Sequence, residues 1–106
     1  MIEIELQIPT DISLDSMPAV VENACVQEGL ITTLKGTLSQ YPSCVHWHLK
    51  KGKERGTLEI TWWEPEKRLW FKVAKNRSGD WIEETIQNLK NRIENSMLET
   101  QMCCYI

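Results

Sequence analysis

One stretch of the sequence decides the fold: CVHWHLKKGKERGTLEITWWEPEKRLWFKVA, residues 44–74. Apolar and polar residues alternate within it, which is typical of strands with one buried face. The alternation predicts strands at residues 44–51, 56–63 and 68–75. Turn-forming residues separate them, at 52–55 and 64–67. The stretch therefore predicts an antiparallel three-stranded meander.

The registers of the two hairpins can be predicted by matching like residues across each turn. A shift of one residue would move every side chain of a strand to the other face, so only one register in each hairpin keeps the apolar residues together. The predicted pairs are Leu49–Leu58, Trp47–Ile60 and Val45–Trp62 in the first hairpin, and Trp63–Arg68, Trp62–Leu69, Ile60–Phe71 and Leu58–Val73 in the second.

The opposite face of the meander is unusually aromatic and basic for a solvated surface. We expect it to be open in the monomer and to bind something, because exposed tryptophans are uncommon without a partner. The candidate binding residues are His46, His48, Lys50, Glu59, Thr61, Trp63, Arg68, Trp70 and Lys72. Arg68 opposite Trp63 also predicts a cation–π contact.

Outside the meander, the sequence predicts two helices and two more strands. A strand at residues 2–8 ends at Pro9, and a helix begins at Asp15 or Ser16 and stops at Gly29. Residues 30–38 are interpreted as a strand, with continuation of the helix as the alternative. A second helix begins at Asp80. The predicted fold is α+β: an antiparallel sheet with both helices on its apolar face, in two layers, as a single domain over residues 1–106.

Composition places the chain among ordinary globular proteins. No apolar run approaches the roughly 20 residues that span a bilayer, and the acidic, alternating start of the sequence is unlike a signal peptide. The four cysteines lack CxxC spacing, which favours reduced thiols and a cytoplasmic location. Residues 35–77 hold ten of the twelve Lys and Arg residues, whereas both flanking segments are acidic. No membrane association is expected.

Two binding functions follow from the second face. The lysines and Arg68 could hold an anionic ligand, with Trp63 and Trp70 stacking the bases of a single-stranded nucleic acid. Alternatively, two such faces could pack together in a homodimer and hide the tryptophans. We expect residues 101–106 to be docked or held by a partner. A non-enzymatic binding or interaction domain is the leading hypothesis.

The runner-up hypothesis is a small metal-binding or hydrolytic enzyme. Alternate residues of a strand point the same way, so His46 and His48 could share an ion, with Glu59 as an oxygen ligand. Cys44 beside His46 suggests nucleophilic catalysis, although no oxyanion hole or nucleophile elbow accompanies it. No cofactor is identified. Residues 103–106 formally fit a prenylation motif, which we interpret as coincidence.

Several short motifs resemble a family of small, uncharacterised bacterial proteins of cyanobacterial type. They are Lys35-Gly36-Thr37-Leu38, Tyr41-Pro42, His46-Trp47-His48, Gly56-Thr57-Leu58-Glu59, Arg68-Leu69-Trp70-Phe71 and Trp81-Ile82. The similarity covers residues 35–85. It implies a bacterial cytosolic protein, and it implies no activity and no residue roles.

Overall fold

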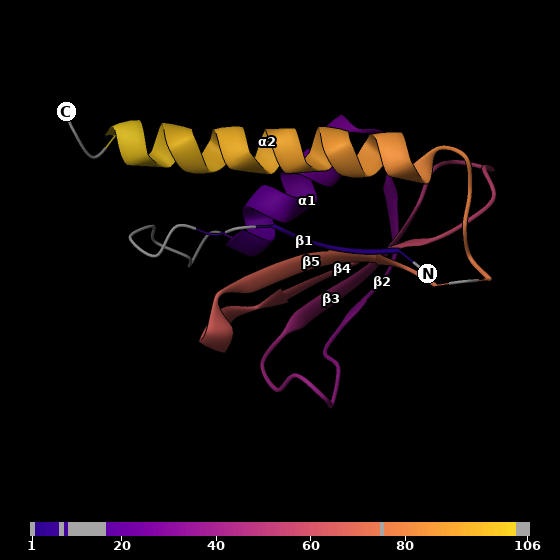
Figure 1. Cartoon of the computed structure of the whole chain (residues 1–106), viewed down its shortest axis with the longest axis horizontal. Coiled ribbons are helices and arrows are strands. Elements are labelled where there is room, and N and C mark those ends of the chain that lie inside the picture. Colours follow the sequence, from indigo (N-terminus) through magenta and orange to yellow (C-terminus); the bar gives the residue numbers. More distant parts are fainter. Residues whose placement is uncertain (1, 7, 9–16, 75, 104–106) are drawn as a thin grey trace.

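The computed structural model describes residues 2–6, 8, 17–74 and 76–103. Its strands are β1 (Ile2–Leu6), β2 (Ile31–Gly36), β3 (Val45–Lys50), β4 (Leu58–Trp63) and β5 (Arg68–Val73). Its helices are α1 (Met17–Gln27), α2 (Ile82–Cys103) and the short 3₁₀ helix η1 (Glu64–Glu66). Both long helices lie on one side of the sheet (Figure 1), so the predicted two-layer α+β fold is confirmed.

The strands form one antiparallel sheet in the order β1-β5-β4-β3-β2. Both predicted hairpin registers are confirmed, because Trp47 pairs with Ile60 and Ile60 pairs with Phe71. The three central strands are a few residues shorter than predicted. β1 pairs with β5, which closes that side of the meander and sets Glu5 opposite Trp70.

The end of α1 follows from the sequence. Gly29 adopts a left-handed conformation with φ of 74°, which glycine tolerates best. Its N–H donates to Val26 O at 3.0 Å, and the N–H of Leu30 donates to Cys25 O at 3.0 Å. These two bonds form a Schellman motif at the predicted end of the helix. Pro9 and the predicted helix caps Asp15 and Ser16 lie outside the described residues.

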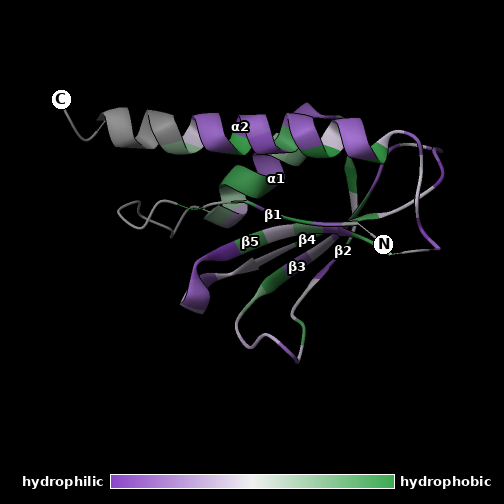
Figure 2. Cartoon of the chain, in the orientation of Figure 1, coloured by the Kyte–Doolittle hydropathy of each residue, from purple (hydrophilic) through white to green (hydrophobic). Residues whose placement is uncertain are grey.

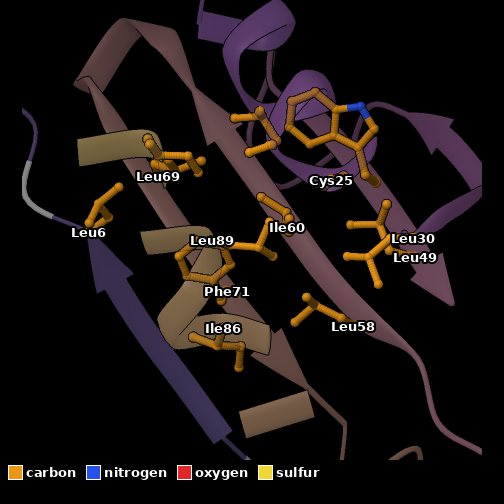
Figure 3. Packing of buried hydrophobic residues seen from close by; sticks show 14 of the residues in the cluster. Leu6, Cys25, Leu30, Leu49, Leu58, Ile60, Leu69, Phe71, Ile86 and Leu89 are labelled. Carbon is orange, nitrogen blue, oxygen red and sulfur yellow. The ribbon is translucent and has the colours of Figure 1, made fainter. Parts of the chain in front are cut away.

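The core lies between the sheet and the helices. Side chains from both helices, such as Cys25 and Leu89, join sheet residues such as Phe71 in one cluster (Figure 3). The apolar stripe of α2 is buried against this core; it consists of Ile82, Ile86, Leu89, Ile93 and Met97. Figure 2 shows hydrophilic residues on the side of α2 that faces away from the sheet. None of the described helices is long and apolar enough to cross a membrane.

β2 confirms the strand interpretation of residues 30–38. It lies at the edge of the sheet and, among the described strands, pairs only with β3, with an irregularity in register between Thr32 and Leu34. Its residues are largely exposed, so the segment lacks the alternation of buried and exposed residues that would identify a strand from sequence. The threonines and the glycines at positions 29 and 36 disfavoured a helix, and backbone pairing with β3 accounts for the strand.

Candidate functional site

The sheet face opposite the helices holds all nine candidate residues. β3 supplies His46, His48 and Lys50, β4 supplies Glu59, Thr61 and Trp63, and β5 supplies Arg68, Trp70 and Lys72. Antiparallel pairing places His48 opposite Glu59 and Glu59 opposite Lys72. β1 adds Glu3 and Glu5 to the same face.

Part of this face is covered, so the expectation of a fully open surface is wrong. The loop between β2 and β3 brings Tyr41 against Trp63 and Trp70, with ring centroids 5.0 Å away in both edge-on contacts. Trp63 Nε1 donates to Pro42 O at 3.0 Å. Trp70 is only 7% exposed, and its ring is therefore not a free stacking platform.

Arg68 makes a different aromatic contact from the one predicted. Its guanidinium carbon lies 5.0 Å from the Trp70 ring, whereas the sequence suggested Trp63. The cause is Glu5, which sits opposite Trp70 on β1. Arg68 Nε and Nη2 donate to the two Glu5 carboxylate oxygens at 3.1 and 2.8 Å, and these bonds hold the pKa of Glu5 below its ordinary value.

The other half of the face brings His46, His48 and Glu59 together. The Nε2 atoms of the two imidazoles are 3.1 Å apart. Glu59 Oε1 lies 3.4 Å from His46 Nε2 and 3.8 Å from His48 Nε2. Three potential ligand atoms thus form a small triangle, and within the described part of the chain these are the residues whose spacing suits a metal ion.

The size of the triangle matches what a metal ion requires. Zinc binds imidazole nitrogen and carboxylate oxygen at about 2.0–2.2 Å, so two ligand atoms of a tetrahedral site are about 3.3 Å apart. The three separations in the structure, 3.1, 3.4 and 3.8 Å, bracket that value. Little rearrangement of the side chains would be needed to accept an ion.

His46 is the most buried member of the triangle, at 5% exposure. Burial is the main cause that lowers its pKa, and nearby His48 and Lys72 act in the same direction against an opposing effect of Glu59. The neutral ring that results keeps a lone pair for a ligand bond. Its Nδ1 lies 2.8 Å from the hydroxyl of Thr61, which is itself 2% exposed and fixes the ring orientation.

Arg77 approaches the same cluster from the loop between β5 and α2. Its carbonyl accepts a hydrogen bond from the N–H of Thr57 at 2.9 Å, so its backbone is tied to the start of β4. Its Nη1 lies 3.5 Å from His48 Nδ1. A guanidinium can only donate, so a hydrogen bond here would use a lone pair on His48 Nδ1.

Two short contacts link the cluster and continue inward to Thr61. His48 Nε2 lies within hydrogen-bond distance of His46 Nε2, and His46 Nδ1 lies within hydrogen-bond distance of Thr61 Oγ1. No buried polar side-chain atom among the described residues lacks a partner. The buried polar atoms of the cluster therefore have partners within the chain.

Cys44 does not join this cluster. It is buried, and its sulfur accepts from the N–H of Leu38 at 3.3 Å. The potential ligand atoms that the structure brings together in its described residues come from His46, His48 and Glu59. The geometry thus gives the predicted thiol–imidazole pair no support.

Three contributors to this face were not anticipated from the sequence. The position of Glu5 beside Arg68 could not be predicted, because alternation does not reveal which strand neighbours β5. Tyr41 lies in the loop before β3, and no pattern in the sequence places it against the tryptophans. Arg77 lies in a loop without periodicity, so no sequence signal marked it.

No protein-family model matches the chain, and no curated protein or solved structure matches it either. The resemblance to bacterial proteins stays a prediction.

Proposed function

We propose that this domain binds a divalent transition-metal ion through the Nε2 atoms of His46 and His48 and a carboxylate oxygen of Glu59. The observation that carries the proposal is the triangle of ligand atoms, whose sides fit the edges of a tetrahedral site. Two imidazoles with one carboxylate form a donor set that suits zinc and its neighbours rather than magnesium or calcium.

The surroundings of the triangle also resemble those of metal sites in general. Metal-bound histidines commonly donate their second ring N–H to an oxygen atom, which orients the ring. Thr61 Oγ1 occupies that position for His46 at 2.8 Å. The lowered pKa of His46 reduces competition from protons for its lone pair.

A metal-binding measurement separates this function from a purely structural hydrogen-bond network. Protein equilibrated with Zn²⁺ and freed of unbound metal should retain one ion per chain by elemental analysis. Glu59→Gln and His48→Gln should lower zinc affinity by more than the roughly 10–100-fold that loss of a supporting partner costs. Glu54→Gln is the matched control, because Glu54 is exposed in the turn between β3 and β4. Equal zinc retention in all four proteins would overturn the proposal.

Self-association is the second candidate, and β2 supports it rather than the tryptophans. Large hydrophobic residues exposed in the described part of the chain include Ile31 at 55% and Leu34 at 47%, both on this edge strand. An edge strand also presents unpaired backbone groups to a second copy. Light scattering should report a dimer that Leu34→Lys converts to a monomer, whereas a monomeric wild-type protein would refute it.

Stacking of a single-stranded nucleic acid gains no support from the geometry. Trp70 is covered by Tyr41, and Arg68 is held by Glu5. One ring expected to stack a base, Trp70, and one cation expected to hold a phosphate, Arg68, are therefore already engaged within the chain. An anionic ligand is better placed beside the metal site.

A further inference from the structure

Three protein ligands leave a metal ion with at least one coordination position for a ligand from solution. The charge around that position favours an anion. A divalent ion opposite the single carboxylate of Glu59 leaves the site positive, before neighbouring cations are counted. Lys72 lies opposite Glu59 on β5 and acts electrostatically on His46. Glu3 of β1 lies opposite Lys72 in the strand register and adds one acid to this part of the face.

Binding of an ion would change the position of Arg77, because Arg77 contacts the ring of His48, a proposed metal ligand. Its Nη1 lies 3.5 Å from His48 Nδ1, a position that suits a guanidinium only while Nδ1 keeps a lone pair. Coordination through His48 Nε2 requires the ring proton to sit on Nδ1 instead. Two donors would then face each other, so the guanidinium has to leave this position. Its backbone stays tied through Thr57 at 2.9 Å, which keeps the released side chain next to the site.

These observations converge on an oxyanion. We propose that the metal ion at His46, His48 and Glu59 takes an oxyanion as its outer ligand, and that Arg77, displaced from His48 by the ion, supplies the second contact to it. A guanidinium presents parallel N–H donors that match the oxygens of phosphate or carboxylate groups. Lys72 adds positive charge from the neighbouring strand. This inference rests on the proposed metal-binding function.

The test uses Co²⁺, whose visible absorption reports coordination directly. Purified full-length protein is titrated with Co²⁺ alone, with inorganic phosphate, and with acetate, each at constant ionic strength. Phosphate or acetate should change the spectrum of the Co²⁺-loaded protein and tighten Co²⁺ binding, by about tenfold if the contact to Arg77 resembles other charged hydrogen bonds. The two anions distinguish a phosphate-bearing from a carboxylate-bearing ligand.

Variants assign the effect to Arg77. Arg77→Ala should bind Co²⁺ at least as tightly as wild type without an anion, because a cation and a competing donor are gone. It should also lose most of the tightening by anions. Lys53→Ala removes a charge from the exposed turn between β3 and β4 and should keep the anion effect.

Each outcome decides one of the two proposals. Absence of Co²⁺ binding would overturn the metal site and the inference with it. Co²⁺ binding that neither phosphate nor acetate alters would overturn the inference and leave the metal site intact. An anion effect that persists fully in Arg77→Ala would exclude Arg77 as the second contact.

Discussion

Thr61 offers the sharpest test of how the site is built. Its hydroxyl lies 2.8 Å from His46 Nδ1, and both residues are almost fully buried. Thr61→Val keeps the shape of the side chain and removes the oxygen. No described side chain replaces that oxygen, so His46 loses the group that holds its ring orientation.

The expected losses can be worked from this geometry. An oriented partner of a metal-bound histidine is worth about 10–100-fold in metal affinity, or about 1.4–2.8 kcal/mol. In the metal-free protein, leaving the buried ring nitrogen unpaired should lower the free energy of unfolding by about 1–3 kcal/mol. Thr61→Ser keeps the oxygen and loses one methyl group, which costs about 1 kcal/mol of stability.

The expected losses of stability overlap for the two variants, so stability alone would not separate them. Metal affinity does, because only one variant loses the hydroxyl. Zinc affinity is measured by competition with a chromophoric chelator, and unfolding by urea with tryptophan fluorescence. Thr61→Ser should bind zinc as wild type does, whereas Thr61→Val should bind it about 10–100-fold more weakly. Wild-type affinity in Thr61→Val would refute the reasoning that the hydroxyl orients His46.

Three further predictions concern the frame of the site. A Cβ at Gly79 would overlap the carbonyl oxygen of Arg55, whereas one at Gly36 would meet nothing within 4 Å. Urea unfolding should therefore show that Gly79→Ala lowers the free energy of unfolding by about 3 kcal/mol and that Gly36→Ala changes it little. Equal stability of the two variants would contradict this packing. Tyr41→Ala should cost about 1–3 kcal/mol, since each aromatic pair contributes about 0.5–1.5 kcal/mol, and should red-shift tryptophan emission, while Tyr41→Phe should leave that emission at the wild-type wavelength. Because the pKa of His46 lies below its ordinary 6.5 in the fold, the unfolded chain takes up its proton first, so the metal-free protein should lose stability as pH falls below about 6.5. A His46→Gln protein should lack that part of the decline, and a decline identical to wild type would count against it.

Much of the fold could be predicted because burial imposes a period on the central strands. Leu49, Ile60 and Phe71 must share the core face, and that requirement fixes both hairpin registers. The same registers place His48 beside Glu59, so the members of the candidate site follow from alternation alone. Their separations do not, because they depend on side-chain rotamers.

The features that could not be predicted depend on contacts between segments far apart in the sequence. Nothing in the alternation of β1 says that it pairs with β5, and the bond between Glu5 and Arg68 depends on that pairing. The cover over Trp70 depends on the path of the loop that carries Tyr41. Arg77 reaches His48 only because its loop passes over Gly56, where a Cβ would lie 2.9 Å from the Arg77 carbonyl oxygen.

The central claim is that His46 and His48 bind one metal ion through their Nε2 atoms. Nitrogen-15 chemical shifts of the two imidazole rings, recorded before and after addition of one equivalent of Zn²⁺, test it most directly. We predict that the Nε2 resonances of both rings move together to the range of metal-bound nitrogen, while both Nδ1 atoms carry protons. Imidazole shifts that do not change when zinc is added would contradict the claim.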